Sequence, residues 1–318
     1  MNLALPARIA LLLALASLPF RFAGALATNA APTDAAPAPD YHFVSSEWHP
    51  LLDDQLSHWE RWLGAPHKSI TTGLPPGTPL SDDGHKGVPL GLNNDPLHVF
   101  TVEMVDGEPV VHVTGEVLGA ITTRDSFSNY HLRVQIKWGE KKWEPKLTVA
   151  RDSGLLYDCT GPNGKMWNAW KRCLEFQIQE NDMGDLFCLE GTCARLPVTK
   201  GLKRWHYDPA APLQPVGAAT GSVTGDVAHL PGSFEKPNGQ WNVLDLYNFG
   251  TRSVQVVNGH IVLATRDLAY VTGPDKTQTP LTGGQIQLQS EGAEVYFRRV
   301  EIRPITDIPA KIKSELGW

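Results

Sequence analysis

Apolar and polar residues alternate with a period of two in segment after segment beyond residue 95. In residues 131–138, every second residue is large and apolar, namely Leu132, Val134, Ile136 and Trp138. Successive side chains of a strand point to opposite faces, so this pattern predicts half-buried antiparallel strands. The segments 174–179, 284–289 and 294–300 show the same alternation.

Weaker strand signals occur at 97–105, 110–114, 119–123, 243–249, 253–257 and 260–264. Asn258-Gly259 separates the last two and tolerates the positive φ of a tight hairpin turn. With 29 Gly and 25 Pro among 318 residues, long helices are excluded. The sequence therefore predicts an all-β protein, a β-sandwich of two antiparallel sheets. One short N-terminal helical segment is expected at 50–63, where leucines recur at near-helical spacing.

The first 27 residues have the pattern of a secretory signal peptide. Arg8 precedes a short apolar run over 9–20, and Ala25-Leu26-Ala27 forms a small-x-small cleavage site. No later stretch approaches the length of a membrane-spanning helix. We expect an exported protein, periplasmic or extracellular, with no transmembrane anchor. After the signal peptide (1–27) we expect an Ala/Pro-rich linker (28–40), a single domain (41–306) and a C-terminal tail (307–318).

Four cysteines fall within 35 residues, at Cys159, Cys173, Cys188 and Cys193. Their spacing contains no CxxC pair, so a zinc knuckle is poorly supported. An exported chain meets oxidising conditions, which favour disulfides. Of the three possible connectivities we favour Cys159–Cys173 and Cys188–Cys193, because each closes a local loop.

Charge and motifs exclude several functions. The formal net charge of −6 argues against nucleic acid as the main partner. The sequence has no GxGxxG after a strand, no Walker A loop, no HExxH and no EF-hand loop. We therefore expect no organic cofactor, and the role of a divalent metal stays open.

The polar faces of the predicted strands are rich in Gln, Glu, His, Arg and Tyr rather than in Lys and Glu alone. Such groups suit ordered hydrogen-bond networks. If the four clearest strands are neighbours, one sheet presents a polar floor for a hydroxyl-rich ligand. The alternative is an ordinary solvated face of a lectin-like scaffold, and the pattern does not choose between the two.

Six motifs in order resemble the 3-keto-disaccharide hydrolase domain family. They are YHLR with WG (130–139), RDSGLLY (151–157), LEFQIQE (174–180), QWN (240–242), VNG (257–259), and GQIQLQ with VYFRRV (284–300). The resemblance runs from about Phe43 to Pro304 and implies a concanavalin A-like jelly roll. Asp158 departs from it, since close relatives have a histidine there. The insertion 200–232 has no assigned role.

The resemblance implies action on sugars whose C3 hydroxyl has been oxidised to a ketone. The ketone acidifies the C2 proton, a base removes it, and the glycosidic oxygen leaves C1 by β-elimination. Water adds back where the net result is hydrolysis. This chemistry needs a base, a stabiliser of the enolate oxygen and an acid at the leaving group. A separate sugar-oxidising enzyme would supply the keto substrate.

Four residues are candidates for catalysis. Glu175 and Glu180 are the candidate base and acid, and Arg151 is the candidate enolate stabiliser. His131 is a candidate proton shuttle or metal ligand. In the competing interpretation, Glu175 forms a structural ion pair with Arg151 across strands. His131 would likewise be a structural partner rather than a catalytic residue.

Six further residues are candidates for substrate binding. Gln177, Gln287, Tyr157 and Arg298 would hydrogen-bond the sugar, although the glutamines equally suit a structural amide ladder and Arg298 suits carbonyl capping. Trp167 and Trp170 lie in the loop between Cys159 and Cys173, where one ring would stack on a sugar face. The competing interpretation places at least one of these indoles underneath the loop.

Two other functions remain open. Glu175-x-Gln177-x-x-Glu180 is similar to the E-x-D-x-x-E strand of retaining glucanases on a jelly roll, where a bulge brings both Glu side chains to one face. The middle Asp is Gln here, which weakens that interpretation. A non-catalytic carbohydrate-binding module is the third interpretation, because fold alone does not decide function.

Overall fold

The structure is a computed structural model that describes residues 37–218, 225–232, 234–273 and 275–318. The predicted signal peptide (1–27) and residues 28–36 of the predicted linker lie outside the described residues. The described part is built almost entirely of strands, which confirms the all-β class. Its elements are β1 (His49–Pro50), β2 (Trp59–Leu63), β3 (Gly91–Leu92), β4 (Phe100–Val105), β5 (Glu108–Val113), β6 (Gly119–Thr123), β7 (Tyr130–Lys142), β8 (Asp152–Thr160), β9 (Arg172–Gln179), β10 (Leu186–Leu189), β11 (Thr192–Lys200), β12 (Trp205–Tyr207), β13 (Leu213–Gly217), β14 (Gly225–Ala228), β15 (Asn242–Phe249), β16 (Arg252–Val257), β17 (His260–Thr272), β18 (Thr277–Pro280), β19 (Gln285–Ser290), β20 (Ala293–Pro304) and α1 (Ala310–Leu316).

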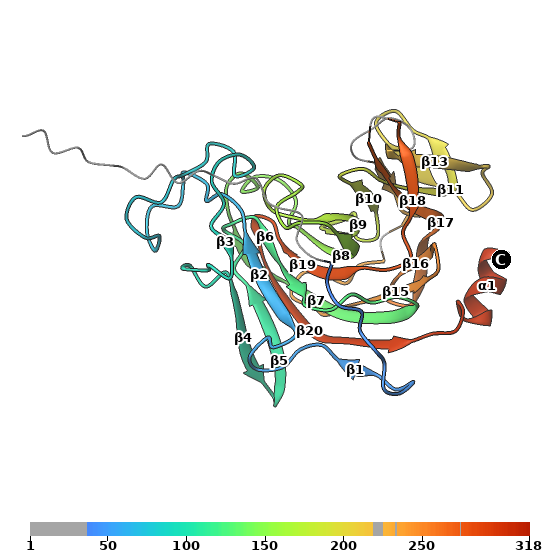
Figure 1. The fold of residues 1–318 in the computed structure, drawn as a ribbon, viewed down its shortest axis with the longest axis horizontal. Helices are drawn as coiled ribbons and strands as arrows, with labels where there is room; N and C mark the ends of the chain where they lie inside the picture. The colour runs from blue at the N-terminus through green and yellow to red at the C-terminus, as the bar shows by residue number, and fades with distance from the viewer. Residues whose placement is uncertain (1–36, 219–224, 233, 274) are drawn as a thin grey trace, which may run out of the picture. The chain divides into compact units, whose positions relative to one another are not determined.

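Two antiparallel ladders make up most of the fold. Ladder one has the order β4–β5–β20–β7–β15–β16–β17, with β1 also paired to β20. Ladder two has the order β3–β2–β6–β19–β8–β9–β10–β14. Figure 1 shows β19 and β8 of ladder two lying over β7, β15 and β20 of ladder one. Apolar side chains from both ladders form one buried cluster between them, which includes Val134, Ile136, Phe176, Leu288 and Phe297.

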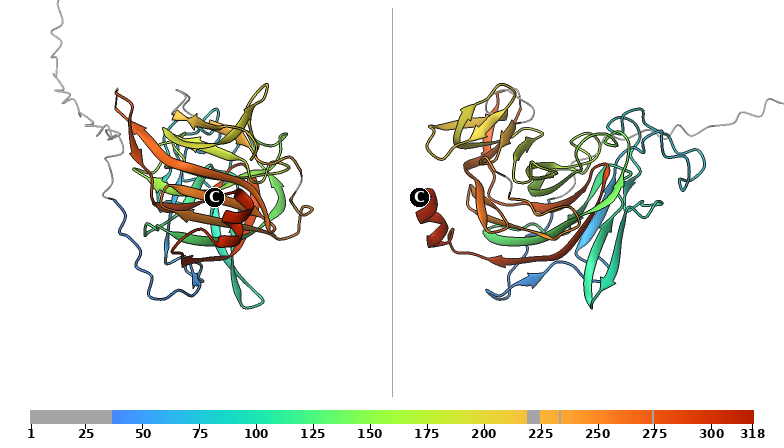
Figure 2. Two further views of the ribbon diagram at one scale, coloured as in Figure 1. Left: turned by 90° about the vertical axis from the view of Figure 1, so that its right-hand side faces the viewer. Right: turned by 180° about the vertical axis from the view of Figure 1, so that it is seen from behind.

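The two ladders are connected through β17 and β11. Residues 260–265 of β17 pair with β16, whereas residues 266–270 pair with β11. Asp267 has a φ of +53° at this change of neighbour. The other end of β11 pairs with β12, and β12 runs parallel to β14 of ladder two. All twenty strands thus form one hydrogen-bonded network, and two separate antiparallel sheets are not confirmed. Figure 2 shows the yellow strands of this connection beside the orange β17.

The strands with the clearest alternation are confirmed as β7, β9, β19 and β20. Leu132, Val134 and Ile136 are fully buried in the core, as their alternation predicts. The predicted hairpin is also confirmed, because Val257 pairs with His260 while Asn258 and Gly259 both have positive φ.

The predicted helix at 50–63 is wrong. Its leucines are buried as expected, but the segment contains the last residue of β1, a turn and β2. The Asp53 carboxylate accepts hydrogen bonds from the backbone N–H groups of Gln55 and Ser57, and Leu56 has a φ of +54°. Side chain–backbone bonds of this kind compete with helix formation, and pairing of β2 with β6 completes the change.

A single polar floor is also wrong. β7 and β20 are neighbours in ladder one, whereas β9 and β19 both flank β8 in ladder two. Each ladder turns its apolar face toward the shared core, so the two sets of polar side chains lie on opposite outer faces. Residues grouped by sequence pattern are therefore divided between two surfaces.

The predicted disulfides are not formed. All four cysteines are buried, and no disulfide joins them among the described residues. The expected neighbours are nevertheless close, since Cys159 and Cys173 lie in one buried cluster and Cys193 contributes to the raised pKa of the Cys188 thiol. Burial raises the pKa of the Cys173 and Cys188 thiols, and a protonated thiol is the form that does not attack a disulfide.

The C-terminal residues predicted as a tail contain helix α1. Ile308 is buried, and Ile312, Leu316 and Trp318 pack against the core cluster. Gly317 in the left-handed conformation ends the helix, and the Trp318 N–H donates to the Lys313 carbonyl at 2.9 Å. No helix among the described residues combines the length and apolar character needed to cross a bilayer.

Asp158 is a carboxyl group inside the core. The pairing of β8 with β9 shifts register between Tyr157 and Thr160, and Asp158 has a φ of +51°. The Asn248 amide donates to both carboxyl oxygens, at 2.8 and 2.9 Å. Burial raises the pKa of Asp158 to about 7, and the Asn248 bonds offset only part of that shift.

We expect Asp158→Asn to remove part of the pH dependence of stability. The folded-state pKa lies above that of the unfolded chain, so the folded protein binds more protons and loses stability as the pH rises from about 4 to 7. This group contributes up to about 1.4 kcal/mol per pH unit in that window. Asparagine also tolerates the positive φ. Urea unfolding at several pH values should show a shallower slope for the variant, and an unchanged slope would contradict the assignment.

Candidate active site

A cluster of polar side chains occupies the outer face of ladder two, on the side away from the shared core. β8 and β9 pair in regular register there, with Gly154 opposite Gln177 and Leu156 opposite Glu175. Directly paired residues share a face, so Asp152, Glu175 and Gln177 project to the same side. Gln289 of β19 lies beside them, because its Oε1 and Glu175 Oε1 both lie within 3 Å of the point that a Cβ on Gly154 would occupy.

Lys146 and Glu291 complete this cluster from outside the central strands. The Lys146 ammonium lies 2.5 Å from an Asp152 carboxylate oxygen and 2.9 Å from one of Glu291. The amide of Gln177 donates to the other oxygen of Asp152 at 3.1 Å. We call Lys146, Asp152, Glu175, Gln177, Gln289 and Glu291 the acid cluster.

The acid cluster holds three carboxyl groups with one cation, and all three are at most 5% exposed. Burial, reinforced by the carboxylates of Glu291 and Asp152, raises the pKa of Glu175 well above its usual range. Burial together with Asp152 raises the pKa of Glu291 to about 8. Burial lowers the pKa of Lys146, but Glu291 and Asp152 more than reverse this and raise it overall. At neutral pH, Glu175 is therefore a neutral acid beside a protonated Lys146.

Three acceptor atoms of the acid cluster have no hydrogen-bond partner among the described residues. They are Glu175 Oε1, Gln177 Oε1 and Gln289 Oε1. Gly154 lies beneath two of them, since a Cβ at this position would collide with Glu175 Oε1 and come within 2.9 Å of Gln289 Oε1. Buried polar atoms are nearly always satisfied in folded proteins. The proton on the neutral Glu175 can serve one of these oxygens, and the remaining ones mark a place for a ligand that donates hydrogen bonds.

His85 and Trp167 form a stacked pair in the loops on this side of ladder two. Their ring centroids are 4.5 Å apart and the planes differ by 5°. The Asn168 side chain donates to the His85 carbonyl at 3.1 Å, which ties the two loops together. His85 Nε2 is buried without a partner in the described structure. Burial, with Lys146 and Lys86 nearby, lowers the pKa of His85, so its imidazole is neutral at pH 7.

The structure separates Glu180 and Arg151 from Glu175. β9 is regular between residues 175 and 179, so Glu175 and Glu180 cannot share a face. Arg151 instead donates to Glu180 at 3.1 Å, and Asn238 donates to the same carboxylate at 2.5 Å. The pairing of Glu175 with Arg151 is therefore wrong, and the carboxylate pair of retaining glucanases is absent from this strand.

His131 and Arg298 lie on the outer face of ladder one. His131 Nε2 lies 2.7 Å from Asp245 Oδ1, and its ring stacks on Tyr247 with centroids 3.9 Å apart. The Arg298 side chain donates to Gln135 and stacks over Trp241. The shared core separates both residues from the acid cluster, so they do not act there.

Three other candidates are held by internal bonds. Tyr157 is in the core, where its hydroxyl bonds Ser253 at 2.9 Å. Gln287 accepts from the Lys171 N–H and donates to Thr122, which is the structural amide interpretation. Trp170 is buried and donates to the Gly119 carbonyl, whereas Trp167 is 44% exposed. Of the two indoles, only Trp167 is available to a ligand.

Sequence reasoning singled out Glu175 and Gln177 of the acid cluster but missed Lys146, Asp152, Gln289 and Glu291. A signal existed for three of them. Period-two alternation places Asp152 with Gly154 on one face of β8, and extends Gln285 and Gln287 to Gln289 and Glu291. Lys146 and His85 come from loops, whose positions no periodicity predicts. Among the described residues, no group of three or more His, Cys, Asp or Glu side chains is arranged to hold a metal ion.

The protein is thus an all-β protein that carries a buried acid cluster on the outer face of one strand ladder. A model of the 3-keto-α-glucoside-1,2-lyase-like domain matches residues 47–303. Because this match covers most of the chain, the protein belongs to that family, as the six motifs predicted. Family membership gives the chain a carbohydrate-active role.

Solved structures show weaker similarity. A candidate glycosyl hydrolase from Parabacteroides distasonis is 17% identical, with a TM-score of 0.44, over 81% of this chain and 100% of that one. A β-glucanase from Bacillus licheniformis is 10% identical, with a TM-score of 0.36, over 84% and 100%. A carbohydrate-binding module from Bacillus subtilis is 11% identical, with a TM-score of 0.35, over 64% and 91%. A search of curated proteins finds no match.

We expect Lys146→Met to destabilise the protein more at pH 8 than at pH 5. Without the ammonium, Asp152 and Glu291 must stay protonated in the fold, which becomes harder as the pH rises. Breaking a buried ion pair costs about 3 kcal/mol or more. Urea unfolding at both pH values measures the difference. Lys165→Met, at an exposed pair with Glu190, is the matched control with little expected effect. Equal destabilisation at both pH values would show that packing, not charge, is lost.

Proposed function

We propose that this protein cleaves 3-keto-glycosides by removal of the C2 proton and β-elimination at C1, with the acid cluster as its active site. The observation that carries the proposal is the set of buried side-chain oxygens without a partner on Glu175, Gln177 and Gln289, beside the Lys146 ammonium. Sugar hydroxyls are the donors that such acceptors lack. Membership in the 3-keto-α-glucoside-1,2-lyase-like family supports the keto substrate.

Each group has one role in the proposed reaction. The neutral imidazole of His85 takes the C2 proton, and the electron pair of that C–H bond becomes an enolate on the C3 oxygen. The Lys146 ammonium stabilises the enolate oxygen. The enolate then re-forms the ketone, a C1=C2 double bond forms, and the C1–O bond breaks.

Glu175 provides the proton for the leaving oxygen. Burial and two neighbouring carboxylates raise its pKa, so it still carries a proton at neutral pH. This assignment reverses the expectation that Glu175 is the base, since a base must be ionised. Water adding across the double bond would give net hydrolysis. Because oxidation at C3 needs another catalyst, a separate enzyme supplies the substrate.

The test compares a chromogenic 3-keto-glucoside with its unoxidised parent, in both anomers, with and without a chelator. Release from the keto substrate alone is the expected result. Release from the parent at equal rate would favour ordinary hydrolysis and overturn the proposal. Binding of both sugars without release of the chromophore would identify a carbohydrate-binding module instead. Loss of activity with chelator would add a metal to the mechanism.

We expect Glu175→Gln to lower kcat about 10²- to 10⁴-fold on the keto substrate, because an amide cannot donate the proton. Aryl leaving groups of low pKa need less protonation, so the loss should shrink as the leaving-group pKa falls. Glu180→Gln is the matched control and should keep most activity, since Glu180 pairs with Arg151 at the end of β9. A larger loss for Glu180→Gln than for Glu175→Gln would contradict the assignment.

A further inference from the structure

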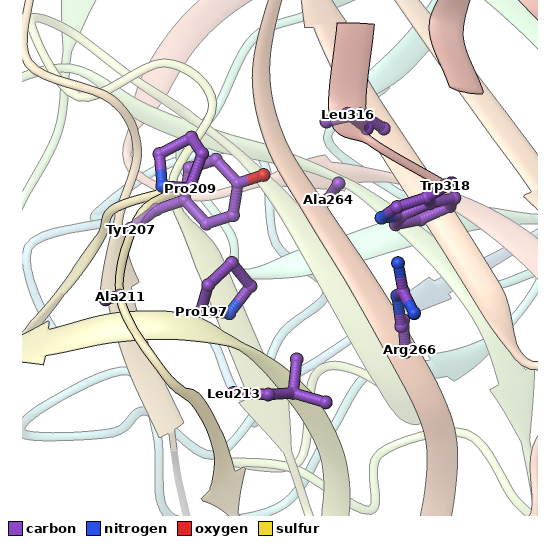
Figure 3. Close-up of a pocket in the computed structure, with 9 residues that line it drawn as sticks. All are labelled: Pro197, Tyr207, Pro209, Ala211, Leu213, Ala264, Arg266, Leu316 and Trp318. Atoms are coloured by element: carbon purple, nitrogen blue, oxygen red, sulfur yellow. The ribbon is translucent and has the colours of Figure 1, made fainter. Parts of the chain in front are cut away.

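A cavity of about 240 Å³ lies apart from the acid cluster, between β17, the segment 205–213 and the C-terminal residues. Figure 3 shows the side chains that surround it. It shares no residue with the acid cluster. Leu316 and Trp318, which form one wall, also lie beyond residue 303, where the family match ends. The cavity therefore depends on a part of this chain outside the matched domain.

Four of the nine residues that line the cavity carry rings. Pro197 of β11, Tyr207 of β12, Pro209 and Trp318 contribute these rings, and Leu213 lies at the lower edge in Figure 3. Tyr207 is buried, and burial raises its pKa to about 12. It therefore presents a neutral ring. The aromatic rings of Tyr207 and Trp318 favour contact with a flat ring of a ligand.

Among the described residues that line the cavity, Arg266 carries the one charged side chain. Its guanidinium carbon lies 4.7 Å from the centroid of the Trp318 ring. No carboxylate of the described residues lies within ion-pair distance of it, whereas the nearby Arg252 pairs with Asp307 at 3.3 Å and Arg195 pairs with Asp267 at 3.5 Å. Stacking occupies a face of the guanidinium and leaves the N–H groups at its edge available for an anion.

We propose that this cavity binds a small aromatic carboxylate. The ring would lie among the prolines, Tyr207 and Trp318, and the carboxylate would accept two hydrogen bonds from Arg266. The volume is below that of typical drug-sized pockets, which limits the ligand to a single ring of about benzoate size. An uncharged sugar would leave the cation without its partner.

The test uses benzoate, its uncharged analogue benzamide, and glucose, each titrated into the purified protein by calorimetry and ligand-observed NMR. Benzoate should bind, and benzamide should bind at least about tenfold more weakly, because a hydrogen bond to a charged group is lost. Arg266→Gln should weaken benzoate about tenfold or more while thermal unfolding stays unchanged. Arg252→Gln is the matched control, because Arg252 also approaches the Trp318 ring but does not line the cavity.

A second variant keeps the test decisive if Arg266→Gln does not fold. Leu213→Trp should fill the cavity and abolish benzoate binding. The proposal would be overturned if benzoate and benzamide bound equally well. Unchanged benzoate affinity in Arg266→Gln or in Leu213→Trp would overturn it too, as would equal losses of benzoate affinity in Arg266→Gln and Arg252→Gln. Glucose that displaces benzoate would overturn the ligand class, and absence of benzoate binding at millimolar concentration would overturn the site.

Discussion

Apolar packing between the two strand ladders is the constraint on which the other features depend. The same strands that send Val134 and Phe297 into the core from ladder one meet Phe176 and Leu288 from ladder two. Since successive side chains alternate, burying one face of each strand forces its polar residues onto the other face. The position of the acid cluster thus follows from the position of the core.

Charge sets the chemistry of that cluster. Three carboxyl groups with one ammonium in a buried place cannot all ionise, so Glu175 keeps its proton at neutral pH. Lys146 reaches the cluster from a loop and pairs with two of the three acids. An acid, a cation and a neutral histidine are therefore available on one side of ladder two, which is the set that elimination from a keto sugar requires.

The opposite ladder and the C-terminal residues carry separate features. His131 with Asp245, and Arg298 with Trp241, form a polar surface on ladder one that the core separates from the acid cluster. The cavity beside Arg266 depends on Trp318, which helix α1 brings against β17. One chain therefore presents chemically distinct surfaces, and each can be tested by variants that leave the others unchanged.

By itself, the sequence determined the all-β class, the strands β7, β9, β19 and β20, the hairpin at Asn258-Gly259 and the family. These features follow from local alternation, turn chemistry and motif order, which can be read from neighbouring residues in the sequence. It also indicated Glu175 and Gln177, because a polar residue among alternating apolar ones is visible locally. The tertiary structure alone decided which strands became neighbours, and this placed His131 and Arg298 far from Glu175. It also decided that the leucines of 50–63 are buried without a helix. The turn at Asp53 and the pairing of β2 with β6 prevail there over the helix that the spacing of the leucines predicts. Lys146 and Glu291 come together beside Asp152 of β8 only after folding, since contacts between residues distant in sequence depend on packing and not on local pattern.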